Sequence, residues 1–347
     1  MLNLMFNLMF NFLLKFLTYP LVILVILLPI LSFATALSDL PGWNSDHQAE
    51  AIPALLHSCK KTSQNSNTLS KSFCTALEQN PNLSDSQTRV LLMKYFTAIP
   101  VTNHGQSTGL FTGYYQPTIT GSLTQTPEDS VPIYGNPPKF LKPFPDRNAI
   151  DVNNALANTK TPVLAWVHSN IDRFFLQIQG SGTIECSNGQ NLLVGYAGQN
   201  GKKYYPIGAY LLKIGALAPN NISMQTIKDW LDTHPKQAQA VMNLNPSFVF
   251  FRILKTPEPT GAHGTELTPY RSLAVDPKFT SLGTPVWLAS VLPKNNISFD
   301  HLLMAEDTGG AIKGPVRGDV FFGDGDQAEW LAGHMQSPGK LWVLKAI

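Results

Sequence analysis

The first helical pattern of the chain covers residues 45–58. Ser45 is placed as an N-cap, and Gln48 completes a capping box with it. Apolar residues then recur with helical spacing. The positions that share this face are Ala49, Ile52, Leu56 and Cys59. The pattern therefore predicts a helix that buries one face.

Similar signals open three later helices. Ser84 and Gln87 form a second capping box, and the apolar run that follows it is stopped by Pro100. Ser223 caps a segment whose apolar residues follow an i, i+3, i+4 spacing. Pro235 ends that segment and starts another short helix.

The other apolar runs are short and are separated by Gly, Pro or Asp, which is typical of strands. The expected strands are 163–167, 173–178, 248–253, 272–275, 285–289, 302–305 and 341–344. Short strands at this spacing suggest a barrel. We therefore expect a mainly β protein with a helical N-terminal segment.

The first 33 residues are predominantly apolar, with Lys15 as their only charge, and a small-x-small sequence ends at Ala36. This arrangement is typical of a signal peptide, so we expect cleavage of residues 1–36 and export to the periplasm. An uncleaved anchor is the alternative, because about 20 apolar residues can span a bilayer. Pro20 and Pro29 argue against it.

The remaining chain of about 310 residues is long enough for one large domain or two ordinary ones. A formal net charge of +2 lacks the basic excess of a nucleic-acid-binding protein and fits an uncharged, sugar-like substrate. The eight histidines are scattered without metal-ligand spacing. We expect neither a metal nor a cofactor.

Two of the three cysteines, Cys59 and Cys74, lie 15 positions apart in the helical segment. In an oxidising compartment we expect them to form a disulfide, which would contribute about 3 kcal/mol of stability. Cys186 would then be the odd thiol. Two buried free thiols are the alternative.

The most informative segment, 304–323, delivers Asp307 and Asp319 into a glycine-rich loop. Glycines let the backbone approach a ligand closely. Asp319 is followed by the apolar run Val-Phe-Phe, and burial beside such a run raises a carboxyl pKa, as a general acid requires. The alternative is that both aspartates only accept backbone N–H bonds to hold the loop.

The segment at 307–314, Asp-Thr-Gly-Gly-Ala-Ile-Lys-Gly, with the later Asp319, resembles the C-terminal signature of the membrane-bound lytic murein transglycosylase A family. Further similar motifs follow in the same order as in the family. They are Phe-Thr-Gly-Tyr-Tyr-Gln-Pro at 111–117, Gln-Ile-Gln-Gly-Ser-Gly at 177–182, Tyr-Pro-Ile-Gly at 205–208, Asn-Pro-Ser-Phe-Val-Phe-Phe at 245–251, Gly-His at 333–334 and Leu-Trp-Val-Leu-Lys at 341–345. The resemblance covers nearly all of 100–345.

The resemblance implies a double-psi β-barrel built from both ends of the chain, 37–116 and 247–347, with a smaller inserted β-domain at 117–246. A substrate groove would run between the two domains, which is a common place for a ligand cleft. The implied substrate is the glycan strand of peptidoglycan.

The resemblance also implies that Asp319 is the catalytic acid and that Asp307 supports it. Asp319 would protonate the glycosidic oxygen between N-acetylmuramic acid and N-acetylglucosamine, then take the proton from the carbon-6 hydroxyl, giving a 1,6-anhydro end. Expected groove residues are Tyr114, Tyr115, Gln179, Ser181 and Lys313. The tyrosines could instead be core or turn residues, and the lysine a solvated loop residue.

Membrane-tethered members of this family carry a lipid-modified Cys directly after the signal peptide. Here that position is Leu37, and the first cysteine is Cys59, so we do not expect a lipid anchor. Association with the outer membrane or with other cell-wall enzymes stays open. We expect a monomer.

Other readings of the same residues are weaker. Asp307-Thr308-Gly309 matches the aspartic-protease triplet, but the sequence has no second copy. The spacing of the acids from Asp319 to Glu329 misses the calcium-loop pattern. A non-catalytic wall-binding module and a two-carboxylate glycoside hydrolase remain as alternatives.

Overall fold

The computed structural model describes residues 34–62, 68–256 and 258–347. Apart from 34–36, the expected signal peptide lies outside these residues. None of the helices in these ranges is long and apolar enough to cross a membrane.

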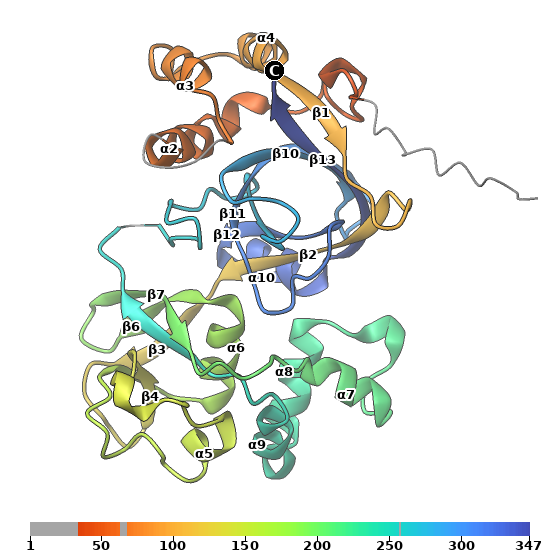
Figure 1. Cartoon of the computed structure of the whole chain (residues 1–347). Helices are drawn as coiled ribbons and strands as arrows, with labels where there is room; N and C mark the ends of the chain where they lie inside the picture. The colour runs from red at the N-terminus through yellow and green to blue at the C-terminus, as the bar shows by residue number, and fades with distance from the viewer. Residues whose placement is uncertain (1–33, 63–67, 257) are drawn as a thin grey trace, which may run out of the picture. The chain divides into compact units, whose positions relative to one another are not determined.

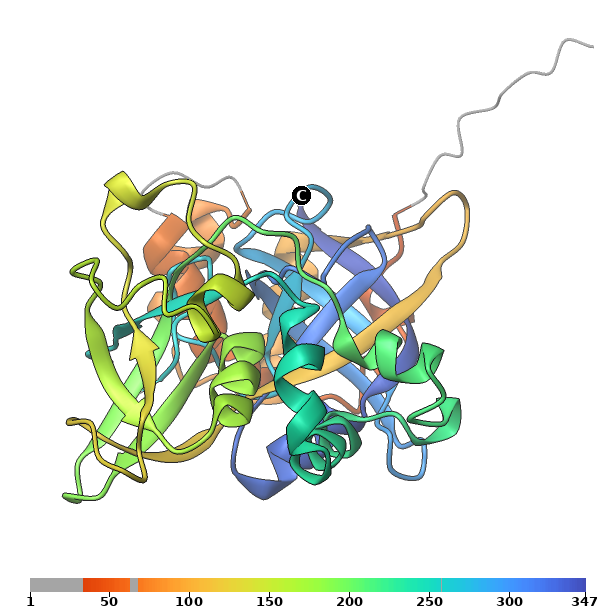
Figure 2. The ribbon, with the colours of Figure 1, turned by 90° about the horizontal axis from the view of Figure 1, so that it is seen from below.

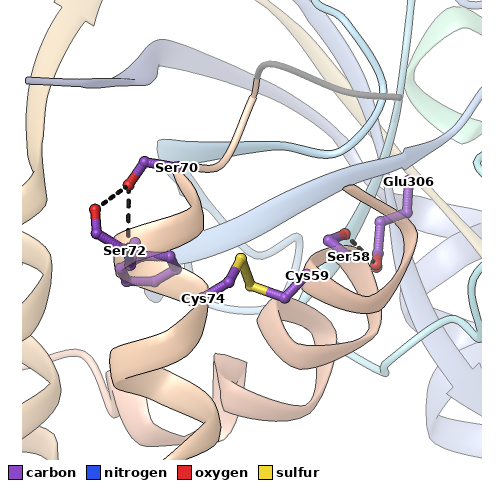
Figure 3. Close-up of a disulfide and its surroundings, with 7 residues drawn as sticks. Ser58, Cys59, Ser70, Ser72, Cys74 and Glu306 are labelled. Carbon is purple, nitrogen blue, oxygen red and sulfur yellow. Dashed lines mark hydrogen bonds between the residues drawn. A yellow bond between two sulfur atoms is a disulfide. The ribbon is translucent and has the colours of Figure 1, made fainter. Parts of the chain in front are cut away.

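The described chain begins with a helical segment (Figure 1). Its elements are η1 (Leu37–Asp39), η2 (Gln48–Ala51), α2 (Ile52–Thr62), α3 (Lys71–Glu78) and α4 (Asp85–Tyr95). The predicted capping box of Ser84 and Gln87 is confirmed at the start of α4. Cys59 on α2 and Cys74 on α3 form a disulfide with a Cα–Cα distance of 5.5 Å (Figure 3), and Cys186 is a buried free thiol.

The predicted start of the first helix at Ser45 is wrong. The Ser45 hydroxyl donates a hydrogen bond back to the Gly42 carbonyl, and the α-helix begins only at Ile52. The neighbouring Asp46 is buried and forms an ion pair with Arg271 on the barrel, at 2.9 Å. This segment therefore bonds to the barrel instead of winding into a helix.

The first sheet closes into a barrel. Its strands are β1 (Phe96–Pro100), β2 (Thr108–Gln116), β9 (Ser272–Val275), β10 (Thr284–Val291), β11 (Ser298–Asp307), β12 (Arg317–Asp324) and β13 (Gln336–Ala346). Their order is β1-β13-β10-β11-β9-β12-β2, and β13 also pairs with β2, which closes the ring and leaves β1 outside it. The chain thus forms the expected double-psi barrel from segments at both ends.

The barrel interior is filled by alternate residues of its strands. Phe111, Leu273, Leu303 and Val320 are fully buried in one apolar cluster. The residues next to them in sequence point outward. On one outer side the helical segment covers the barrel, where Trp43 and Trp287 contact each other at a ring distance of 5.1 Å. Helix α10 (Gly325–His334) lies between β12 and β13 in the chain.

The inserted region forms a second sheet, seen with the barrel in Figure 2. Its strands are β3 (Thr118–Ser122), β4 (Val131–Tyr134), β5 (Val163–Val167), β6 (Ser181–Cys186), β7 (Asn191–Gln199) and β8 (Val249–Ile253), in the order β4-β5-β3-β6-β7-β8. Because β8 pairs with β7, this sheet continues past residue 246, the expected end of the insertion.

Several helices accompany this sheet. They are η3 (Lys139–Leu141), α5 (Arg147–Asp151), α6 (Asn170–Gln179), α7 (Ile207–Lys213), η4 (Pro219–Asn221), α8 (Met224–Thr233) and α9 (Pro235–Asn243). The predicted starts at Ser223 and Pro235 are confirmed. The predicted strand at 173–178 is wrong, because these residues lie in α6, which Ser169 caps. The apolar residues Ile171, Phe174, Phe175 and Ile178 follow an i, i+3, i+4, i+7 spacing, which is typical of a helix with one buried face.

Candidate functional site

A cleft of about 1050 Å³ is lined by residues of both the barrel and the second sheet. Six of the predicted site residues line it. They are Asp307, Asp319, Tyr114, Gln179, Ser181 and Lys313. The glycine-rich loop that follows β11 forms part of the same lining. The two aspartates therefore face a space that is large enough for a chain of sugar rings.

Asp319 lies on β12 and is held by a short chain of hydrogen bonds. Arg317 Nη2 donates to the Thr112 hydroxyl oxygen at 2.7 Å, and that hydroxyl in turn donates to Asp319 Oδ1. Burial raises the pKa of Asp319 more than the Arg317 charge and the Thr112 hydrogen bond lower it. Asp319 is therefore biased toward the protonated form.

Asp307, at the end of β11, has more donors. Its Oδ1 accepts from the backbone N–H groups of Ala262 and Thr308, both at 2.9 Å. Its Oδ2 accepts from the Tyr114 hydroxyl at 3.0 Å. Burial nevertheless raises the pKa of Asp307, and the negative charge of Asp319 raises it further, against these three donors. Both of its oxygens are occupied by protein groups.

The strand register places the two aspartates side by side on one wall. Asp307 and Asp319 both pair with Ala274, which lies on β9 between their strands. Two strand spacings separate their Cα atoms, which corresponds to about 10 Å. Ala274 also lines the cleft, and its small side chain leaves the surface between the two carboxyl groups open.

Strand alternation separates the two predicted tyrosines. Tyr114 points from β2 into the cleft, whereas Tyr115 is buried in the barrel core. The prediction of Tyr115 as a groove residue is corrected by this placement, since successive residues of a strand face opposite sides. Only the Tyr115 backbone approaches the site, where its N–H donates to Gln179 Oε1 at 3.1 Å.

The remaining predicted residues have different surroundings. Ser181 is buried at the start of β6. Lys313 is exposed, and its charge acts on Asp276. Burial raises the pKa of Asp276, but the N–H donors of Gly314 and Lys278 and the Lys313 charge lower it overall.

The chain that forms this cleft is similar to known proteins. Two family models match the chain, the "MltA specific insert domain" over residues 110–252 and the "3D domain" over 271–345. The crystal structure of MltA from Neisseria gonorrhoeae is 30% identical with a TM-score of 0.77, and the match covers 90% of this chain and 91% of that one. The chain belongs to the membrane-bound lytic murein transglycosylase A family.

The chain is also similar to other members of this family. The "Membrane-bound lytic murein transglycosylase A homolog" of Buchnera aphidicola is 38% identical over 243 residues, which are 67% of this chain and 65% of that protein. This chain thus spans about two thirds of the length of that curated relative. A crystal structure of E. coli MltA with bound chitohexaose is 28% identical with a TM-score of 0.72, covering 90% of this chain and 91% of that one.

Glu306 is a buried carboxyl that sequence reasoning missed. It is fully buried beside Asp307 and accepts hydrogen bonds from the hydroxyls of Ser272 at 2.6 Å and Thr265 at 3.1 Å. A third hydrogen bond comes from the Ser58 hydroxyl at 3.2 Å (Figure 3). Burial raises its pKa to about 8 despite these donors. The register shifts between Ala305 and Asp307, so Glu306 is an extra residue of β11 without a partner on β9, while Asp307 still pairs with Ala274.

Tyr204, on the second-sheet side, was also missed. A side chain added at Gly310 would meet Tyr204 at 3.4 Å, so this tyrosine lies against the glycine-rich loop. Burial raises the pKa of Tyr204, and the negative charge of Asp319 raises it further. The available signal was sequence proximity, because Tyr204 directly precedes the family motif at 205–208.

Proposed function

We propose that this chain is a peptidoglycan lytic transglycosylase in which Asp319 acts first as acid and then as base. Membership of the transglycosylase A family supports the substrate class. The chitohexaose bound to the E. coli relative supports a cleft that accepts chains of N-acetylated sugars. The export segment expected at 1–36 fits a periplasmic enzyme.

One observation carries the single-acid mechanism. Among the described residues that line the cleft, the only carboxyl groups are those of Asp307 and Asp319, and both belong to the barrel wall. A two-carboxylate hydrolase needs a second group that faces the first across the sugar, as nucleophile or base. Asp307 lies beside Asp319, and its three hydrogen-bond donors leave it poorly placed to activate water.

The hydrogen-bond pattern also supports the starting position of the proton. Three donors favour the ionised form of Asp307, whereas Asp319 has one donor. Since two neighbouring carboxyl groups resist ionising together, Asp319 holds the proton. Arg317 donates to the Thr112 oxygen, which directs the Thr112 hydrogen to Asp319 Oδ1. Asp319 Oδ2 is left for the substrate.

In the first half of the reaction, Asp319 gives its proton to the glycosidic oxygen, and the bond from that oxygen to the anomeric carbon of N-acetylmuramic acid breaks. Positive charge develops on the muramic ring. In the second half, the carbon-6 hydroxyl of the same ring attacks the anomeric carbon and returns a proton to Asp319. The products are a free N-acetylglucosamine hydroxyl and a 1,6-anhydro end, and no water is consumed.

Digestion of purified peptidoglycan in heavy-oxygen water tests this proposal. Internal attack gives an unlabelled anhydro end, whereas hydrolysis introduces the label into a reducing end. Mass spectrometry should find anhydro ends as the main product. Labelled reducing ends would instead favour a hydrolase.

Asp319→Asn should fold normally and lose activity by several orders of magnitude, because an amide cannot donate the required proton. Asp307→Asn is the matched control and should retain more activity, since Asp307 only supports the acid. The opposite ranking would move the acid to Asp307. Wild-type protein that binds glycan strands without cleaving them would favour a non-catalytic binding module.

A further inference from the structure

Charge is distributed unevenly across the cleft. Of the described lining residues, the carboxyl groups all come from the barrel, while the second-sheet side supplies four cations and no acid. These cations are Arg147, Lys202, Lys203 and Arg252. A formal charge of only +2 for the whole chain means that this wall does not simply reflect a basic protein. A neutral glycan strand offers no negative charge that could pair with these cations.

Three of these cations carry no counter-charge. Lys202, Lys203 and Arg252 are exposed, and none of the ion pairs among the described residues includes them. Their charges are therefore available to a bound molecule. Arg252 lies on β8, where it pairs with Gly195 of β7.

The loop that carries the two lysines is held by hydrogen bonds to two buried asparagines. Asn200 is buried, and its side-chain oxygen accepts from the N–H of Lys202 at 3.2 Å and of Phe248 at 3.0 Å. Buried Asn245 accepts from the N–H of Tyr205 at 3.1 Å. The backbone of 200–205 is thus tied to the second sheet at both ends, and the lysines project from a defined position.

Arg147 adds a buried positive charge to the same wall. Its guanidinium donates to the carbonyls of Asn245 and Ser247 and to Gln177 Oε1, at 2.6–3.0 Å. Arg147 lies 3.7 Å from Asp151, but Asp151 also pairs with buried Arg173 at 2.6 Å. Two buried guanidinium groups share one carboxylate, so one positive charge stays unbalanced beneath the cleft.

We propose that Lys202, Lys203 and Arg252 form a carboxylate-binding subsite for the acidic substituent of the glycan strand. The inference rests on the proposed function, because peptidoglycan differs from chitin-type strands in carrying carboxylates on its muramic residues. Two sources share this chemistry, the lactyl ether carboxylate and the carboxylates of an attached peptide stem. The subsite makes the enzyme select substituted strands over neutral ones.

The test measures binding in the inactive Asp319→Asn background, so that no ligand is consumed. Three ligands are used: chitohexaose, which is neutral; glycan strands stripped of peptide by an amidase, which keep the lactyl carboxylate; and strands with intact stems. The triple variant Lys202→Gln/Lys203→Gln/Arg252→Gln is compared with Lys139→Gln/Lys213→Gln/Lys236→Gln. The control removes the same charge from exposed lysines outside the cleft.

The subsite variant should bind carboxylated strands about tenfold more weakly, because three exposed ion pairs each contribute modestly. Its affinity for chitohexaose should be unchanged, and the control should match the parent with every ligand. An effect with stripped strands assigns the lactyl group, and an effect confined to intact strands assigns the stem. Equal weakening for chitohexaose, or no weakening at all, overturns the subsite.

This outcome is separable from the proposed function. If the wild-type protein produced no anhydro ends, the transglycosylase proposal would fail while the binding difference could still be measured. If anhydro ends formed but the variant bound all ligands like its control, only the subsite would fail.

Discussion

Replacing Glu306 with glutamine tests whether a buried carboxyl beside the site keeps its proton at neutral pH. Glutamine has the same shape and can still hydrogen-bond to the hydroxyls of Ser58, Thr265 and Ser272. It cannot ionise. The variant should therefore fold and retain activity at neutral pH, because it imitates the protonated form of Glu306.

The magnitude follows from the pKa of Glu306, which burial raises from 4.5 to about 8. Between these values the folded protein holds a proton that the unfolded chain has released. Stability therefore falls as pH rises, by about 1.4 kcal/mol per pH unit, and the decline ends once the folded state also ionises. From about pH 5 to about pH 7 this amounts to roughly 3 kcal/mol, which Glu306→Gln should not lose.

Urea unfolding at several pH values measures the difference. The wild-type free energy of unfolding should decline relative to that of Glu306→Gln across this range. Glu185→Gln, a change at an exposed glutamate on β6, should follow the wild type. Groups remote from both substituted positions titrate equally in all three proteins and cancel in the comparison. Parallel curves for the wild type and Glu306→Gln would refute a buried protonated Glu306.

Three further predictions concern other contacts. Thr112→Val removes a hydrogen bond that lowers the pKa of Asp319. The alkaline limb of the kcat/KM profile, where the acid loses its proton, should therefore shift to higher pH. An unshifted limb would assign this titration to another group. Replacing Cys59 and Cys74 with serine should reduce the free energy of unfolding by about 3 kcal/mol in urea titrations, and thiol labelling of both cysteines without reductant would contradict the disulfide. Asp46→Asn should lower the free energy of unfolding by about 3 kcal/mol, because buried Arg271 would lose its buried carboxylate partner and keep only the exposed Glu50. Burial opposes the ionised form of Asp46, but His301 and Arg271 lower its pKa overall. The stabilisation by Asp46 should therefore be present above the pKa of Asp46 in the unfolded chain and be lost as pH falls through its pKa in the folded protein. Equal free energies of unfolding for Asp46→Asn and the wild type at neutral pH would contradict this prediction.

The sequence predicted correctly those helices whose first residues are fixed by contacts within one turn of the chain. The capping boxes at Ser84 and Ser223 each lie within one turn of chain, and both helices begin there. Ser45 carried the same signal but did not start a helix, because Asp46 bonds to Arg271, far away in the sequence. Helix α6 carries a local signal in the helical spacing of Ile171, Phe174, Phe175 and Ile178, and the prediction of a strand from the aromatic and branched residues at 173–178 overlooked it.

The candidate site likewise combines residues that are close in the sequence with contacts that are distant in it. Asp307 and Asp319 belong to one continuous motif, so the sequence could predict them together. Tyr114 and Tyr115 are neighbours, and only the phase of β2 decides which of them reaches the cleft. The burial and the hydrogen bonds of Glu306 could not be predicted from the sequence, because its three hydroxyl partners lie at least 34 positions away from it in the chain.

The closed barrel has a consequence for the order in which the candidate site forms while the chain is being made. β13 pairs with β1, β2 and β10, and Phe96 of β1 meets Ala346 of β13 about 250 positions later. Such distant pairings form slowly and only after the late strand is available. The wall that carries both aspartates uses β2 from the early part of the chain and β12 from the late part. A nascent chain that lacks β12 therefore has no assembled pair of aspartates, and the wall that carries them forms only after residues 317–324 have been made.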